Sequence, residues 1–103
     1  MSFQRISAEQ AQQQLGAGAT LVDIRDPLAY AAGHVAGAVR IDNENLSAFL
    51  AKTNADAPLL VMCYHGHSSQ TAAQFFANQG FSSVASVEGG FEGWKRQLPF
   101  VTS

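Results

Sequence analysis

The sequence predicts an α/β domain with a central, mainly parallel sheet flanked by helices. Short apolar runs typical of strands alternate with stretches of helical periodicity along the 103 residues. The run Leu59–Met62 is apolar at every position, which is typical of a parallel strand buried on both faces. Because alternating elements of this kind are joined by right-handed crossovers, their strands lie side by side in one sheet.

The first predicted helix spans residues 8–15. Ser7 precedes it and Gln10 follows three residues later, so the two side chains can form a capping box with the first backbone amides. Gly16 marks the end, because glycine readily adopts the backbone angles that follow a helix.

A strand predicted over residues 20–24 precedes a short helix over residues 28–32. The strand segment is mostly β-branched and apolar. Asp26 can cap the helix, and Pro27 suits the first turn, where its missing amide hydrogen would be unpaired in any case. A second short strand is expected over residues 38–41.

A third helix is expected after Asn43, whose side chain can cap the first turn. Leu46, Phe49 and Leu50 follow with i, i+3 and i+4 spacing and therefore share one helical face. A loop then leads to the apolar strand Leu59–Met62.

The remaining sequence continues the alternation. A fourth helix is predicted over residues 69–79, because its apolar residues have helical spacing and Gly80 ends the pattern. A last strand over residues 83–87 and a short amphipathic helix over residues 91–97 follow.

Composition favours one autonomous domain over residues 1–103. Apolar residues make up 47% of the chain and charged residues 14%, which is enough apolar material for a core without cross-links. The formal net charge of -2 provides no broad basic field, so we expect neither nucleic acid nor a membrane surface as a partner. A single cysteine rules out an internal disulfide, and without an apolar leader segment we expect a cytoplasmic protein.

The single cysteine, Cys63, directly follows the strand Leu59–Met62. Open parallel sheets bind ligands at the carboxyl ends of their strands, where free amides of a turn and a helix N-terminus can hold an anion or a thiolate. Position alone leaves two interpretations open: a nucleophile beside an anion site, or an inert core cysteine.

The loop after this cysteine is polar and contains glycine. Gly66 permits unusual backbone angles, and Ser68 or Ser69 can cap the following helix. His65 and His67 have no further clustered ligands, so loop polarity or substrate contact explains them better than metal binding. We expect neither a metal nor another cofactor.

Three segments resemble the rhodanese superfamily, especially its short single-domain members. They are LVDIRD at 21–26 followed by Tyr30 and GHVAGA at 33–38, CYHGHSS at 63–69, and VEGGFEGW at 87–94. The first is similar to the strand and Gly-His turn of the family, the second to its active-site loop, and the third to its closing Gly-Gly and tryptophan signature. The resemblance implies a single rhodanese-like domain.

The resemblance also implies an enzyme, a thiosulfate:cyanide sulfurtransferase. Cys63 would take the outer sulfur of thiosulfate as a persulfide, release sulfite and pass the sulfur to a thiophilic acceptor. Cyanide is the usual test acceptor, and a small thiol or a dithiol protein such as thioredoxin is the implied cellular class. Backbone amides of six loop residues would bind the persulfide and the anionic donor: Tyr64, His65, Gly66, His67, Ser68 and Ser69.

Three further residues match the first family segment. By resemblance, Asp23, Arg25 and His34 would fix loops near the site through hydrogen bonds and an ion pair. A purely structural scaffold role explains the same residues. Trp94 fits core packing better than substrate contact, because it lies on an apolar helix face.

Two positions depart from the family pattern. Ser68 stands where many single-domain relatives have an arginine before the serine that closes the loop. The thiolate would then depend more on backbone dipoles, and Arg25, Arg40 or Lys95 could contribute only if the fold brings them near. Ala36 replaces a usual proline, which should alter only the stiffness of that turn.

Two other functions compete with sulfur transfer. Phosphatases and arsenate reductases of this fold family hold a tetrahedral oxyanion with the arginine of a Cys-x5-Arg loop, but the sixth residue after Cys63 is Ser69. A sulfur carrier or regulatory interaction module with slow turnover would use the same thiol and differ only in its partner.

Overall fold

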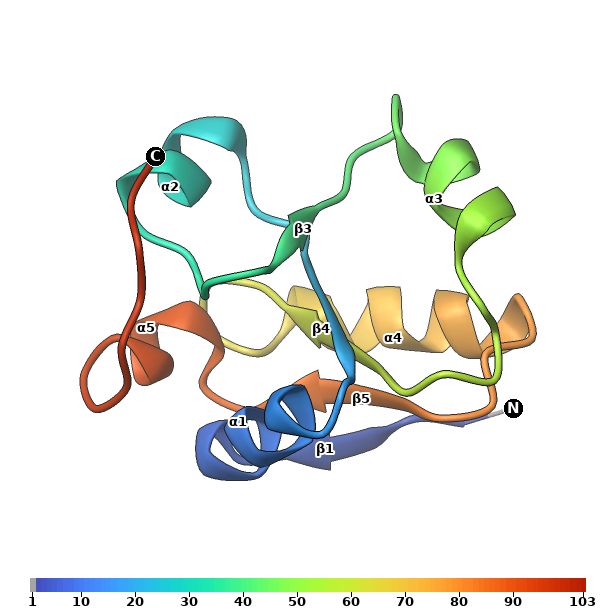
Figure 1. Ribbon diagram of the computed structural model, residues 1–103, viewed down its shortest axis with the longest axis horizontal. Helices are drawn as coiled ribbons and strands as arrows, with labels where there is room; N and C mark the ends of the chain where they lie inside the picture. Colours follow the sequence, from blue (N-terminus) through green and yellow to red (C-terminus); the bar gives the residue numbers. More distant parts are fainter. Residues whose placement is uncertain (1) are drawn as a thin grey trace.

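The structure, a computed structural model that describes residues 2–103, contains a five-stranded sheet (Figure 1). Its strands are β1 (Gln4–Ile6), β2 (Thr20–Asp23), β3 (Val39–Arg40), β4 (Leu59–Met62) and β5 (Val84–Val87). Their order across the sheet is β1-β5-β4-β2-β3, and every neighbouring pair is parallel. The predicted α/β fold with a mainly parallel sheet is confirmed.

Helices cover both faces of the sheet. They are α1 (Ala8–Gly16), α2 (Pro27–Ala32), α3 (Leu46–Lys52), α4 (Ser68–Asn78) and α5 (Gly90–Trp94). Side chains of β4 alternate between two core clusters, because successive residues of a strand point to opposite faces. Leu60 and Met62 pack with residues of α1 and α5, whereas Leu59 and Val61 pack with residues of α3 and α4.

The central strand β4 fixes the place of the cysteine that follows it. All four of its side chains are at most 1% exposed, and burial of each leucine, valine or methionine contributes about 1.5–3 kcal/mol. A shift of β4 would expose these side chains, so Cys63 has a defined position at the carboxyl edge of the sheet.

No helix within residues 2–103 is long and apolar enough to cross a membrane.

Strand β1 was not among the predicted elements. It is only three residues long, and its burial pattern is exposed, exposed, buried. It lies at one edge of the sheet, where it pairs with β5 and contributes Ile6 to the core. A strand with one buried side chain has too little alternation to stand out from a loop.

Two predicted helix starts are confirmed. Ser7 Oγ accepts a hydrogen bond from the amide of Gln10 at 3.1 Å, and Gln10 Oε1 accepts one from the amide of Ser7 at 2.9 Å, which completes the capping box of α1. Asp26 Oδ1 accepts from the amide of Ala29 at 2.9 Å, and Pro27 is the first residue of α2.

The predicted cap of the third helix, Asn43, is wrong. The carboxylate of Asp42 instead accepts hydrogen bonds from the amides of Glu44 and Asn45, at 2.8 and 3.1 Å. This turn delays the helix, which begins at Leu46 without a side-chain cap. Aspartate and asparagine satisfy turns and caps by the same hydrogen bond, so two such residues in sequence made the choice ambiguous.

Candidate active site

Cys63 lies at the carboxyl end of β4 and is 4% exposed. The segment after it rests on the N-terminus of α5: the amide of Phe91 donates to the carbonyl of Cys63 at 2.8 Å, and the amide of Glu92 donates to the carbonyl of Tyr64 at 3.0 Å. Gly90 allows this approach, because a Cβ at its position would lie 2.5 Å from the carbonyl oxygen of Cys63. The N-terminus of α5 therefore holds the backbone of the cysteine loop through these two hydrogen bonds.

The loop wraps its polar groups around the cysteine sulfur. The amides of Gly66 and Ser69 donate to Sγ of Cys63 at 3.1 and 3.2 Å, and the hydroxyl oxygen of Ser69 lies 3.3 Å away. Gly66 has a φ of +90°, and a Cβ there would lie 2.8 Å from the amide nitrogen of Gly89. Only glycine allows this turn, so the sequence of the loop determines where its amides point.

The environment of the thiol favours its ionised form. Burial of Cys63 raises its pKa, but hydrogen bonds from the hydroxyl and amide of Ser69 and from the amides of Gly66 and His65 lower it. The hydrogen bonds outweigh burial, and the pKa lies below the usual value of 9.0. A larger thiolate fraction near neutral pH is a requirement for a nucleophilic cysteine.

Neither Ser68 nor Ser69 caps the helix that follows the loop. α4 begins at Ser68, with His67 in the cap position and no side-chain cap. The hydroxyl of Ser69 is fully buried and turns inward, where it meets both the cysteine sulfur and the hydroxyl of Ser86 on β5 at 2.7 Å. These two partners offset the cost of burying the hydroxyl, so Ser69 faces inward and does not cap the helix.

The other side chains of the loop point outward. The side chains of Tyr64, His65, His67 and Ser68 are exposed. These residues would therefore contact a substrate through their backbone amides, or through their side chains if the ligand lies at the surface. Within residues 2–103 no three histidine, cysteine or carboxylate side chains are grouped so that they could hold a metal ion.

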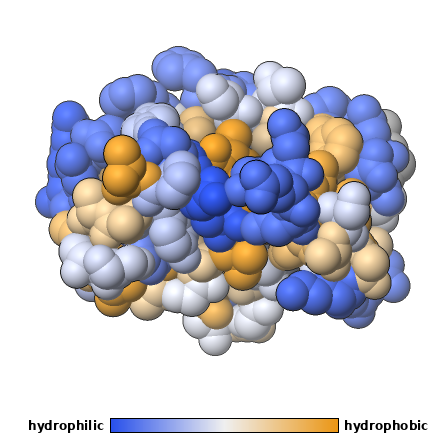
Figure 2. All heavy atoms as spheres, turned by 90° about the horizontal axis from the view of Figure 1, so that it is seen from above, coloured by the Kyte–Doolittle hydropathy of each residue, from blue (hydrophilic) through white to orange (hydrophobic). Residues whose placement is uncertain are grey.

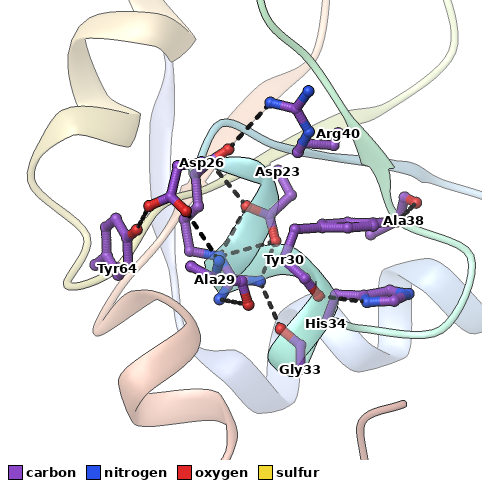
Figure 3. Close-up of polar contacts among 10 residues, drawn as sticks. Asp23, Asp26, Ala29, Tyr30, Gly33, His34, Ala38, Arg40 and Tyr64 are labelled. Atoms are coloured by element: carbon purple, nitrogen blue, oxygen red, sulfur yellow. Dashed lines mark hydrogen bonds and ion pairs between the residues drawn. The ribbon is translucent and has the colours of Figure 1, made fainter. Parts of the chain in front are cut away.

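Asp23 and Arg25 form a buried ion pair beside the site. Nη2 of Arg25 donates to Oδ2 of Asp23 at 2.6 Å and to the carbonyl of Gly33 at 2.8 Å (Figure 3). The guanidinium carbon also lies 4.2 Å from the ring centroid of Phe91 on α5. The pair thus joins the end of β2 to α2 and α5, which both contact the cysteine loop.

None of the three cations considered from the sequence donates to the cysteine sulfur in the described part of the chain. Arg25 is bound to Asp23, Arg40 pairs with Asp42 at 2.7 Å, and Lys95 pairs with Glu92 at 3.0 Å. Backbone amides and one hydroxyl are therefore the groups that stabilise the thiolate.

His34 serves the packing of the chain end. Its Nδ1 lies 2.8 Å from the carbonyl oxygen of Tyr30, and the two rings stack with their centroids 3.9 Å apart. The backbone of His34 exchanges hydrogen bonds with Val101, at 2.9 and 2.8 Å. His34 thereby holds the C-terminal segment against α2.

A contact between Tyr64 and Asp26 was not predicted from the sequence. The Tyr64 hydroxyl donates to Oδ2 of Asp26, and Figure 3 shows the two side chains pointing toward one another. This hydrogen bond lowers the pKa of Asp26 and raises the pKa of Tyr64, because it stabilises the carboxylate and the neutral phenol. It links the first residue of the loop after the cysteine to the N-terminus of α2.

An open cleft of about 610 Å³ lies near the loop. It is formed by the end of β2, the connection from β3 to α3, and one side of α4, and Asp26 is among its lining residues. Figure 2 shows the molecule from the side of α2, β3 and α3, with apolar side chains in separate patches among hydrophilic ones. The cysteine loop, residues 63–69, does not line this cleft, so the cleft neighbours the sulfur site without containing it.

Comparison with known proteins shows the family to which the chain belongs. The sequence matches the family described as "Rhodanese-like domain" over residues 7–97. The chain belongs to the rhodanese-like family. Among its curated relatives, "Thiosulfate sulfurtransferase GlpE" of Pseudomonas paraeruginosa is 54% identical over 102 residues, which cover 99% of this chain and 93% of the relative. The protein of the same name from Stutzerimonas stutzeri is 53% identical over 97 residues, which cover 94% and 89%.

Solved structures of rhodanese-like proteins share the fold. A rhodanese-related protein from Thermoplasma volcanium superimposes with a TM-score of 0.84 at 26% identity, covering 98% of this chain and all of that one. A rhodanese-like domain protein from Staphylococcus aureus, 19% identical, has a TM-score of 0.82, with 98% and 99% covered. Within the rhodanese-like fold, the three family segments predicted from the sequence meet at one edge of the sheet.

Proposed function

We propose that this rhodanese-like protein is a thiosulfate sulfurtransferase that carries sulfur as a persulfide on Cys63. The observation that carries the proposal is the set of hydrogen bonds that joins Sγ to the amides of Gly66 and Ser69 and to the hydroxyl of Ser69. Relatives above 50% identity bear the name thiosulfate sulfurtransferase GlpE, which supports the same substrate.

In the first half-reaction the Cys63 thiolate attacks the outer sulfur of thiosulfate. A bond forms between Sγ and that sulfur, and the sulfur–sulfur bond of thiosulfate breaks. Its electron pair leaves with sulfite, and the protein retains a persulfide anion. The loop amides are already oriented toward the sulfur, so they stabilise negative charge without reorganisation during the reaction.

In the second half-reaction a nucleophilic acceptor attacks the outer persulfur atom. The bond to Sγ breaks and its electron pair restores the Cys63 thiolate, while the acceptor keeps the sulfur. Cyanide, which becomes thiocyanate, serves as the acceptor in an assay. A small thiol or a dithiol protein of the thioredoxin kind is the proposed cellular acceptor.

The composition of the loop favours sulfur transfer over phosphoryl transfer. A phosphatase of this fold class needs a guanidinium that holds the oxyanion bidentately. The sixth residue after the cysteine is Ser69, whose side chain faces the sulfur. The two amides and the one hydroxyl around the sulfur suit the single negative charge of a persulfide.

Intact-mass measurement tests the proposal directly. Thiosulfate-treated protein should be one sulfur atom heavier, and cyanide should remove that atom with formation of thiocyanate. The variant Cys63→Ala should gain no mass and release no sulfite, because the chain has no second thiol. Wild-type protein that gains no sulfur, or hydrolysis of an aryl phosphate that is lost in Cys63→Ser and as fast as sulfur transfer, would overturn the proposal.

A further inference from the structure

Two buried serines extend the hydrogen-bond network of the cysteine into the sheet. Sγ of Cys63 lies 3.3 Å from Oγ of Ser69, which lies 2.7 Å from Oγ of Ser86. Ser86 belongs to β5, where it stands opposite Val61 in the register with β4. Ser69 and Ser86 are at most 1% exposed, so this chain of contacts is closed off from the solvent.

The charge on the sulfur determines the direction of these hydrogen bonds. A thiolate can only accept, so Ser69 must donate its proton to Sγ. The oxygen of Ser69 then has only lone pairs to offer, and Ser86 must donate to it. In the neutral thiol state the sulfur can donate to Ser69, and both bonds can reverse. Ionisation of Cys63 and the orientation of Ser86 are therefore coupled.

We propose that Ser86 is a positioning residue for sulfur transfer, whose hydroxyl donates to Ser69 and so keeps the Ser69 proton directed at the cysteine sulfur. The inference rests on the proposed role of Cys63. It assigns a part in the chemistry to a residue of β5 whose hydroxyl hydrogen-bonds with Ser69 and not with the sulfur itself. In a dry environment each bond of such a chain polarises the next, which strengthens the contact of Ser69 with the thiolate.

The charged and titratable side chains around the two serines are either paired with one another or exposed to solvent. Near the sulfur, Asp23 pairs with Arg25 and Glu92 pairs with Lys95, while the loop histidines 65 and 67 are exposed. Beside Ser86, the neighbouring strand carries Arg5, and Glu88 follows β5; both are exposed. Within residues 2–103, the hydrogen bonds of the three groups are with one another and with loop amides.

The pH dependence of alkylation at Cys63 provides the test, because it reports the thiolate and not the general integrity of the fold. Ser86→Ala should raise the pKa of the cysteine by about half a unit and slow alkylation at neutral pH about threefold. Ser69→Ala should have the larger effect. In the double variant the pKa should equal that of Ser69→Ala alone, because Ser86 acts only through Ser69.

Two further variants separate positioning from stability. Val84→Ala removes buried volume from the same strand and should lower the unfolding temperature while the pKa of Cys63 stays unchanged. Ser86→Thr keeps the hydroxyl and should keep the wild-type pKa. A wild-type pKa in Ser86→Ala, a shift that persists in the Ser69→Ala background, or a threonine variant that behaves like alanine would overturn the inference.

The same proteins distinguish this inference from the proposed function. Wild-type protein that gains sulfur from thiosulfate, together with an unshifted Ser86→Ala variant, contradicts only the role of Ser86. Wild-type protein that gains no sulfur contradicts the role of Cys63, whatever the alkylation profiles show. Under the proposal, Ser86→Ala still gains one sulfur atom, but its pH profile for sulfite release moves upward with the pKa of its cysteine.

Discussion

Nη2 of Arg25 lies 2.6 Å from Oδ2 of Asp23, and both side chains are almost completely buried. The pair is formed within three residues of sequence, yet its other contacts reach the carbonyl of Gly33 and the ring of Phe91. The pair thus connects the end of β2 to α2 and α5. Removal of one partner leaves a buried charge without its counterion.

Asp23→Asn should therefore lower the free energy of unfolding by about 3 kcal/mol, a large part of the stability of a small domain. Chemical denaturation measures this loss. The matched control is Lys95→Met, which breaks the exposed pair with Glu92 and should cost less than about 1 kcal/mol. Equal losses in the two variants would contradict a structural role of the buried pair.

The rate of Cys63 alkylation should rise with pH through an inflection below 9.0, because the loop hydrogen bonds lower the pKa of the thiol. Since the folded-state pKa is the lower one, the thiolate contributes stability that is complete above 9.0 and is lost as the pH falls through the folded pKa. Thiosulfate should slow alkylation by converting the thiolate to a persulfide. An inflection at or above 9.0 would contradict the stabilised thiolate.

Gly90→Ala should reduce sulfur transfer about tenfold or more, because its Cβ would meet the carbonyl oxygen of Cys63 at 2.5 Å and displace the loop. Gly37→Ala is the matched control. Gly37 also has a positive φ, +84°, but a Cβ there meets nothing within 4 Å, so this variant should lose about 1 kcal/mol of stability and keep its activity. Steady-state rates and denaturation curves of both variants test this difference.

Tyr64→Phe should raise the pKa of Asp26 toward its usual 3.8, because the hydrogen bond from the Tyr64 hydroxyl is the main cause that lowers it. The Asp26 carboxylate should consequently become protonated at a higher pH, as followed by NMR titration of its carboxyl carbon. Tyr30→Phe breaks a different hydrogen bond, to the carbonyl of Ala38 at 2.6 Å, and should leave the Asp26 titration unchanged. Identical titrations in both variants would show that the Tyr64 contact has no effect.

Exhaustive chelation should leave sulfur transfer intact, because exposed His65 and His67 have no further ligands grouped with them among residues 2–103. Activity before and after chelation, with metal content measured on the same samples, tests the prediction. Loss of activity that zinc restores would assign the two histidines to a metal site.

Strong local signals explain which parts of the fold the sequence could predict. The apolar run of β4 and the cap residues Ser7 and Asp26 each depend on a few neighbouring positions, and the structure has them as expected. Asn43 failed as a cap because Asp42, one residue earlier, forms the turn instead. Edge strand β1 has one buried side chain, which is too little for a periodic signal.

The residues of the cysteine loop carry local sequence signals, whereas Asp23 and Arg25 were expected beside the loop only from the family resemblance. Cys63 and Gly66 mark the loop by themselves, since a reactive thiol and a special backbone angle each require a particular residue. Ser86 gives no such signal, because a serine in a short strand usually faces solvent. Its burial against Ser69 arises from the pairing of β5 with β4, and Asp26 meets Tyr64 for a similar reason across 38 residues.

The pairing of β1 with β5 also bears on the order in which the protein can form during synthesis. Gln4 stands opposite Ala85 in the sheet, so β1 can pair with β5 only after the whole segment between them has been made. Until then β1 has no strand to pair with, and β4 lacks its neighbour on one side. Contacts so distant in sequence form slowly, because a long loop must close before they contribute. Ser86 belongs to the same late strand, so the Ser69–Ser86 contact beside Cys63 forms only after β5 has been synthesised.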